Sequence, residues 1–178
     1  MGHRQLILDK ITSITDATDA AFDLELTRML DSASRIFISG AGRSALVARF
    51  FAMRLMHGGY NVFVVGEIVT PSLGKDDLLI VISGSGETET MIAFAKRAKE
   101  LGAKLVLISS RTSSTLADMS DRVIPIGKPD MYGKVLGMPM GTVFELSTLI
   151  FLEAVISHII HEKGIPEEEM RARHANLE

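Results

Sequence analysis

The sequence contains no cysteine among its 178 residues, which excludes disulfide bonds, thiolate metal sites and cysteine nucleophiles. It also lacks an excess of basic residues, because 19 Lys and Arg stand against 22 Asp and Glu and the formal net charge is -3. A chain without a positive field has no general attraction for nucleic acid or for an acidic membrane surface. Any anionic ligand must therefore be bound by local contacts.

Signals that direct a chain to or across a membrane are also missing. Residues 1–5 are not followed by the apolar stretch of a secretory signal. We find no apolar run of the length that spans a bilayer. Together with the absence of cysteine, this predicts a cytoplasmic protein with no membrane partner.

The length and composition suit one domain. With 47% hydrophobic and 23% charged residues, the chain can bury one substantial core but is short for two domains. We expect a single domain over residues 1–178. Its parts are an N-terminal helical segment over 1–33, an α/β core over 34–163 and a C-terminal tail over 164–178.

Short β-branched runs alternate with segments that have the apolar spacing of helices. The runs predict five buried strands, at residues 35–39, 62–66, 78–83, 105–109 and 123–126. Alternation of strand and helix favours a mainly parallel sheet. A long helix is expected after Gly141, ending at Gly164, and a short one near the C-terminus. The predicted fold class is α/β, a three-layer α/β/α sandwich with a five-stranded, mainly parallel sheet.

A glycine-serine loop follows the first predicted strand and leads into a helix. In open parallel sheets, functional sites lie at the carboxyl ends of strands, where such loops begin. The loop, Ser39 to Ser44 (SGAGRS), also fits the dinucleotide-binding fingerprint through Ala45. That interpretation requires an acidic residue at the end of the next strand, and Glu67 comes slightly late for this role. The spacing alone leaves the ligand of this loop open.

A second glycine-serine loop, SGSGET, follows the third predicted strand and is suited to a phosphate monoester. Glycines allow close approach of the backbone, hydroxyl groups donate hydrogen bonds, and the start of a helix adds free N–H groups. The alternative is that Ser85 and Thr88 only cap a helix and the glycines only form a turn. The candidate binding residues are Ser83, Gly84, Ser85, Gly86, Glu87 and Thr88.

Few side chains qualify as acid or base for proton transfer next to such a site. Glu145 lies one turn into the long helix, where it can face a ligand or simply interact with the helix dipole, and spacing alone favours the dipole. His57 ends a helix, a common place for a dipole partner, and His174 lies in a polar tail that composition predicts to be frayed. No histidine spacing indicates a metal site.

The two loops together resemble those of the SIS family of sugar isomerases, and further segments resemble the 6-phospho-3-hexuloisomerases within it. The segments are FAMRLMH (51–57), VGE with TPS (65–72), KDDLLIVISGSGET (75–88), PMGTVFE (139–145), LIFLE (149–153) and RHANLE (173–178). The resemblance covers nearly the whole chain from Arg35 onward. One departure is Leu146, where similar family members carry Gln or Glu.

This resemblance implies an isomerase that interconverts D-arabino-3-hexulose 6-phosphate and fructose 6-phosphate through an enediol, in the ribulose monophosphate pathway of formaldehyde fixation. It implies no metal, no organic cofactor and a homotetramer. The loop of Ser83, Ser85 and Thr88 matches the family's phosphate cradle, and Ser44 beside Arg43 matches a second substrate contact. Glu145 matches the base, while His57 and His174 match further positions that we assign to the catalytic set.

Two alternatives remain open. A different aldose-ketose isomerase of the same fold, such as one acting on arabinose 5-phosphate, would keep both loops but not the RHANLE tail. A non-catalytic module that senses a sugar phosphate would usually be joined to a DNA-binding domain, and this sequence contains none.

Overall fold

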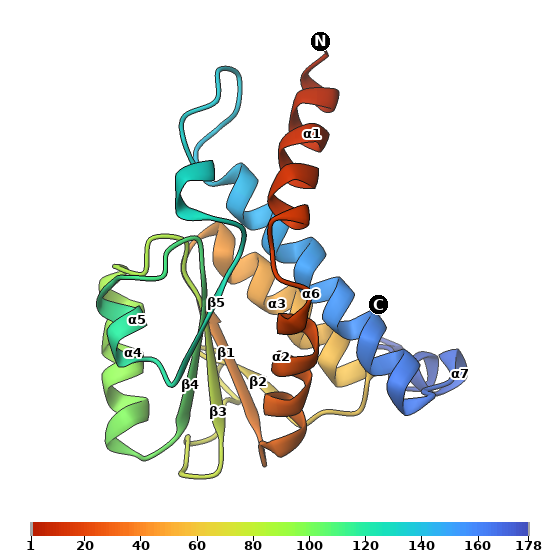
Figure 1. Ribbon diagram of the computed structural model, residues 1–178. Coiled ribbons are helices and arrows are strands. Elements are labelled where there is room, and N and C mark those ends of the chain that lie inside the picture. The colour runs from red at the N-terminus through yellow and green to blue at the C-terminus, as the bar shows by residue number, and fades with distance from the viewer. Residues whose placement is uncertain (1, 178) are drawn as a thin grey trace.

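A five-stranded parallel sheet forms the centre of the computed structural model, which describes residues 2–177 (Figure 1). The strand order is β2-β1-β3-β4-β5, and every neighbouring pair is parallel. The strands are β1 (Ile36–Gly40), β2 (Val62–Val64), β3 (Leu78–Ile82), β4 (Lys104–Ser109) and β5 (Arg122–Pro125). All five predicted strands are confirmed, each within two residues of the expected bounds.

Helices cover both faces of the sheet, so the predicted three-layer α/β/α arrangement is confirmed (Figure 1). One face carries α1 (His3–Asp16), α2 (Ala21–Ser32), α3 (Arg43–His57) and α6 (Thr142–Lys163). The other face carries α4 (Glu89–Glu100) and α5 (Thr115–Met119). The short α7 (Glu167–Ala172) follows α6, and a 3-10 turn, η1, spans Pro129–Met131.

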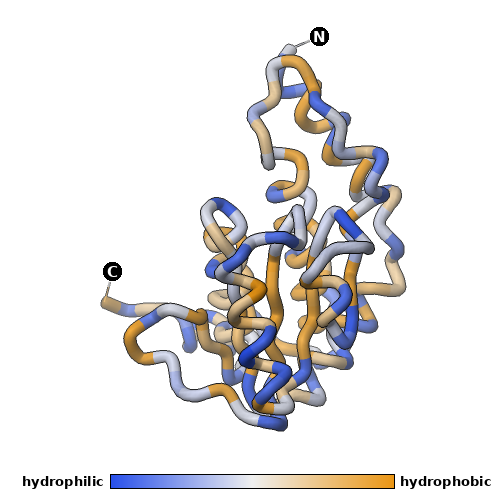
Figure 2. The backbone as a smooth tube through the Cα atoms, turned by 90° about the vertical axis from the view of Figure 1, so that its left-hand side faces the viewer, coloured by the Kyte–Doolittle hydropathy of each residue, from blue (hydrophilic) through white to orange (hydrophobic). Residues whose placement is uncertain are grey.

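Two apolar layers hold these helices to the sheet, because successive strand residues point to opposite faces. On β3, Ile80 belongs to the layer under α3 and α6, while Leu79 and Val81 belong to the layer under α4. All three side chains are buried, as expected for a strand covered on both faces. Figure 2 shows the same pattern as apolar strands at the centre of the molecule with polar segments around them.

The strand order places both glycine-serine loops side by side. From β1 the chain continues to β2, which pairs with one edge of β1, and then to β3, which pairs with the other edge. The direction in which strands are added to the sheet therefore reverses between β1 and β3. Gly40 at the end of β1 is in register with Ile82 at the end of β3. Ligands bind outside the carboxyl ends of the strands at such a reversal. The loops that follow these two strands therefore start as neighbours.

Three details differ from the sequence expectations. The N-terminal helical segment is two helices, because the chain breaks between Asp16 and Ala21. At this break, Thr18 donates its hydroxyl proton to the carbonyl of Ile14 and accepts a hydrogen bond from the N–H of Gly127 (2.8 Å). The helix α5 and the turn η1 were not predicted, since both are too short to show a periodic apolar pattern.

The expectation about apolar runs was wrong. Helix α6 has 22 residues and is long and apolar enough to cross a membrane by length and composition alone. However, nine of its residues are buried, and it packs against α1, α2 and α3 as the central helix of its layer. Helix α6 is therefore a packed helix of this layer that leaves one side exposed, as Ile150 shows.

Candidate active site

The loop between β3 and α4 presents hydroxyl and backbone N–H groups. The Ser83 Oγ atom accepts a hydrogen bond from the N–H of Gly86 (3.2 Å) and lies 3.3 Å from the Thr88 Oγ1 atom. The Ser85 Oγ atom accepts a hydrogen bond from the N–H of Glu87 (3.2 Å). Within residues 2–177, the N–H groups of Gly84 and Ser85 have no acceptor. The loop thus offers unused donors to an anion.

The capping alternative is wrong for Thr88. This residue occupies the N-cap position of α4, but its side chain accepts no hydrogen bond from the helix. The first-turn N–H groups of α4 therefore lack the partner that a capping hydroxyl would supply. The Glu87 carboxylate accepts a hydrogen bond from the N–H of Thr115 (2.9 Å), and this bond is the main reason why the pKa of Glu87 is lowered.

A third segment, residues 110–114 after β4, supports this loop and was missed at the sequence level. The Ser110 hydroxyl donates to the carbonyl of Gly84 (2.7 Å), and a Cβ atom at Gly86 would lie 2.0 Å from the Ser114 Oγ atom. Gly86 also has a φ of +68°, so this position requires glycine for two independent reasons. The position of this segment at the carboxyl end of a predicted parallel strand was the signal that could have identified it.

The first loop brings α3 directly onto the end of β1. A Cβ atom at Gly40 would lie only 2.8 Å from the carbonyl carbon of Ser44, so glycine here permits close approach of strand and helix. Arg43 and Ser44 form the first turn of α3. This packing role explains Gly40 without a dinucleotide, and the φ of +56° explains why Gly42 is a glycine.

Glu145 reaches the same region from α6. Its N–H donates to the carbonyl of Gly141 (3.0 Å), and its carboxylate accepts a hydrogen bond from the Nε atom of Arg43. The Glu145 side chain is 12% exposed, whereas that of Arg43 is 62% exposed. Gly141 adopts a left-handed conformation (φ +88°), and a Cβ atom there would lie 2.7 Å from the Glu145 Oε1 atom. Glycine before α6 therefore leaves room for the carboxylate.

These three loops and the start of α6 enclose one cavity of about 590 Å³. Its volume lies within the range typical of small-molecule sites, roughly 300–1,000 Å³. The polar residues that line it are Ser44, Ser85, Ser110, Arg111, Thr112, Ser113, Tyr132 and Glu145. Hydroxyl donors and a carboxylate thus face a common space. That arrangement can hold a polyhydroxy anion and move a proton on it.

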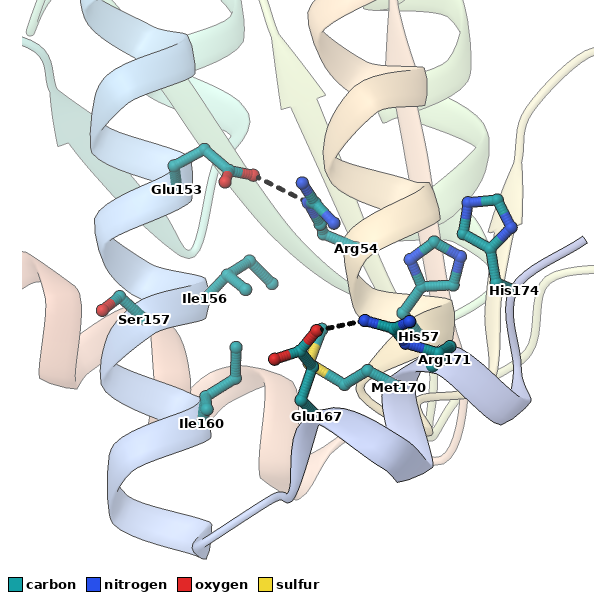
Figure 3. A pocket seen from close by; sticks show the side chains of 10 residues that line it. All are labelled: Arg54, His57, Glu153, Ile156, Ser157, Ile160, Glu167, Met170, Arg171 and His174. Atoms are coloured by element: carbon teal, nitrogen blue, oxygen red, sulfur yellow. Dashed lines mark hydrogen bonds and ion pairs between the residues drawn. The ribbon is translucent and has the colours of Figure 1, made fainter.

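The structure does not bring His57 and His174 to this cavity. Their rings stack on each other, with centroids 5.2 Å apart, and line a second cavity of about 580 Å³ (Figure 3). His57 ends α3 and Arg43 begins it, so about 21 Å of helix separates them at a rise of ~1.5 Å per residue. Within one chain, the histidines are therefore far from the Glu145 carboxylate that contacts Arg43.

The C-terminal tail is more ordered than its composition indicates. After α7, the guanidinium of Arg173 donates to the carbonyl of His57 (3.1 Å), which attaches the tail to the end of α3. Glu178, the last residue of the RHANLE segment, lies outside the described residues. In residues 2–177, no group of three or more acidic or histidine side chains is placed to hold a metal ion.

Comparisons with known proteins agree with this geometry. The family model of the SIS domain matches residues 29–155. A 3-hexulose-6-phosphate isomerase from Methylomonas aminofaciens is 52% identical over 178 residues, covering 99% of this chain and 98% of that protein. Another from Bacillus subtilis is 42% identical over 153 residues, covering 83% of this chain and 82% of that protein.

Solved structures agree as well. A hypothetical protein from Methanococcus jannaschii, for which a molecular function of 3-hexulose-6-phosphate isomerase was inferred, has a crystal structure that superposes with a TM-score of 0.89. It is 37% identical, and the match covers 100% of both chains. 6-Phospho-3-hexuloisomerase is another name for the same enzyme, so the resemblance found in the sequence is confirmed. The chain belongs to the SIS domain family and, within it, to the family of the 3-hexulose-6-phosphate isomerases.

Proposed function

We propose that this protein interconverts D-arabino-3-hexulose 6-phosphate and fructose 6-phosphate. The observation that carries the proposal is one cavity that contains both an anion-binding loop and a shielded carboxylate, in a chain 52% identical to a protein named for this reaction. The substrate class follows from the loop, and the reaction class follows from the carboxylate. The reaction serves the fixation of formaldehyde onto a pentose phosphate and takes place in the cytoplasm.

The phosphate binds to the loop from Ser83 to Thr88. The unpartnered N–H groups of Gly84 and Ser85 and the uncapped start of α4 all provide partial positive charge. The hydroxyl groups of Ser83 and Thr88 lie 3.3 Å apart on the same loop and can both donate to phosphate oxygens. Binding therefore relies on neutral donors in addition to the dipole of α4.

Glu145 is the base. It removes the proton from C2 of the 3-ketose, the electrons form the C2–C3 double bond of a cis-enediol, and the same carboxyl group returns the proton to C3. A proton passes from O2 to O3, so the 2-ketose is formed with no net gain or loss of atoms. Holding the substrate by its phosphate contributes much of the rate by fixing C2 near the base. Arg43, which contacts Glu145, is the proposed donor to the enediolate oxygen.

A second copy of the chain covers the exposed side of α3 and α6. The apolar residues of α6 surround its whole circumference, and such a helix is normally buried on all sides, yet Ile150 remains 45% exposed. On α3, Leu46, Phe50 and Met53 form one exposed stripe at helical spacing. Arg54 joins the two helices through its contact with Glu153 (3.4 Å). An exposed apolar patch of this kind marks a protein interface. A homotetramer contains two pairs of chains that are each joined through this patch.

The pairing accounts for the distant histidines. Two copies related by a two-fold axis use the same patch on both sides. If the axis crosses the middle of the α3 stripe, the two α3 helices run antiparallel. The end that carries His57 and His174 then lies beside the partner's first turn of α3, where Arg43 contacts Glu145. Each site would thus use Glu145 from one copy and both histidines from the other.

Mixing two inactive variants tests the shared site. Glu145→Gln and His174→Ala chains, unfolded and refolded together, should regain partial activity, because some mixed sites draw both intact residues from different chains. Native mass spectrometry shows whether mixed oligomers have formed. No recovery in confirmed mixed oligomers would contradict a shared site.

The reaction itself is tested by a coupled assay. Ribulose 5-phosphate and formaldehyde are supplied with a hexulose phosphate synthase, and fructose 6-phosphate is measured with and without this protein. Arabinose 5-phosphate serves as the alternative substrate. Turnover of arabinose 5-phosphate alone would favour a different isomerase, and binding without turnover of either sugar would favour a sensor module.

A further inference from the structure

The cavity that contains Ser85 and Glu145 is lined by a cation to which the sequence comparison assigns no role. Arg111 lies on the segment between β4 and α5. Among the described residues that line this cavity, Arg111 is the only basic side chain and Glu145 is the only acidic one. Arg111 is therefore the one positive side chain that these lining residues offer to an anion in the cavity.

Hydrogen bonds fix the backbone at Arg111 against the phosphate loop. The N–H of Arg111 donates to the Ser109 hydroxyl oxygen (3.1 Å), and the hydroxyl groups of Ser109 (3.2 Å) and Ser110 (2.7 Å) both donate to the carbonyl of Gly84. The residues before Arg111 are thus tied to the loop itself. The arginine side chain consequently starts next to the loop and extends from a rigid base.

The guanidinium of Arg111 is not used by a protein carboxylate. None of the ion pairs within residues 2–177 includes it. The positive charge of Arg111 nevertheless acts on Glu87. The hydrogen bonds from Thr115 are the main cause of the lowered pKa of Glu87, and the charge of Arg111 lowers this pKa further. Glu87 places a negative charge on the loop that binds the phosphate, and Arg111 opposes that charge.

We propose that Arg111 binds the substrate's phosphate together with the loop from Ser83 to Thr88, and that it gives the site its affinity for doubly charged phosphate monoesters. A phosphate monoester carries a charge of roughly -1.5 to -2 at pH 7, whereas the loop supplies only neutral donors and the carboxylate of Glu87. The planar guanidinium can donate two parallel hydrogen bonds to phosphate oxygens. This inference rests on the proposed function, since it takes the loop as the phosphate site.

The first test is Arg111→Gln in the coupled assay. The Michaelis constant should rise roughly ten- to hundred-fold, the loss typical of a charged hydrogen bond, with kcat within about threefold, because a phosphate contact acts alike in ground and transition states. Arg111→Lys should give an intermediate Michaelis constant, since lysine keeps the positive charge but cannot donate the two parallel hydrogen bonds of a guanidinium. Arg97→Gln, an exposed arginine of α4 that pairs with Glu100, is the matched control and should match the wild type.

A second test separates direct binding from an effect through Glu87. If Arg111 only offset the charge of Glu87, Arg111→Gln would have no effect in a Glu87→Gln background. We expect the rise in the Michaelis constant to persist in that double variant. Its disappearance would overturn the proposal.

Calorimetry with inorganic phosphate needs no turnover and so separates this proposal from the proposed function. Wild type and Arg97→Gln should bind phosphate equally, and Arg111→Gln should bind it roughly ten-fold or more weakly. Equal phosphate affinity in wild type and Arg111→Gln overturns the proposal even if the enzyme is fully active. Weakened phosphate binding in a protein that never turns over a hexulose phosphate supports the Arg111 assignment and overturns only the proposed reaction.

Discussion

Replacing Glu145 by glutamine separates catalysis from structure in this protein. The substitution keeps the size of the side chain and removes its ability to accept a proton. Among the described residues, no other carboxylate lines the cavity, so no second carboxylate of the same chain can take over as base. Turnover should therefore fall by roughly a hundred- to ten-thousand-fold, the range for loss of a general base.

The contacts of Glu145 predict only a small loss of stability. Its ion pair with Arg43 joins a shielded carboxylate to an arginine that is 62% exposed, and the solvent around that arginine keeps the contribution near that of exposed pairs, about 0–1 kcal/mol. The favourable position of a carboxylate in the first turn of α6 adds about 0.3–1 kcal/mol. At most about 2 kcal/mol is lost, which corresponds to roughly 4–8 °C in melting temperature for a chain of this length. The variant should therefore remain folded at assay temperature.

The measurement is the coupled assay together with calorimetry for fructose 6-phosphate. The affinity of Glu145→Gln for this ligand should stay close to that of the wild type, since the phosphate loop is unchanged. Glu100→Gln is the matched control, because Glu100 also pairs with an arginine (2.9 Å) but lies at the far end of α4. Turnover of Glu145→Gln within about tenfold of the control would refute the assignment of the base.

Two further variants test the phosphate loop. The double variant Ser85→Ala and Thr88→Ala should chiefly raise the Michaelis constant, and unchanged calorimetric binding of fructose 6-phosphate would remove these hydroxyls from the site. Gly86→Ala should lower the melting temperature by several degrees, since it forces a side chain into a left-handed conformation and against Ser114. Gly133→Ala, where a Cβ atom meets nothing within 4 Å, is its control, and equal melting temperatures would contradict the argument.

The sheet and its first two loops could be predicted because their signals are local. Each strand is a short apolar run between polar residues, and a strand buried on both faces keeps such a run continuous. The αL glycine at Gly164 and the following proline similarly end α6 where expected. In these cases, the residues that determine the structure are adjacent in the sequence.

The rest depends on contacts between distant residues. The role of Ser110 is visible only because its hydroxyl reaches the carbonyl of Gly84, 26 positions away. Nothing in the sequence near Glu145 shows that Arg43 contacts it, since 102 positions separate them. The apolar character of α6 was missed for a different reason: polar residues such as Glu153 interrupt its apolar run, so this character appears only over the full helix.

Helix α3 separates the two groups of residues that the proposed shared site combines. Its first turn contributes Arg43 and Ser44 to the phosphate end, and its last residue is the buried His57, against which His174 stacks. Both groups are attached to one rigid element, so neither can approach the other within a chain without breaking that helix. In the proposed pairing, a second copy brings them together. The exposed apolar stripe between the two ends is placed where such a copy would bind, and losing the oligomer should therefore abolish catalysis while leaving phosphate binding to the loop intact.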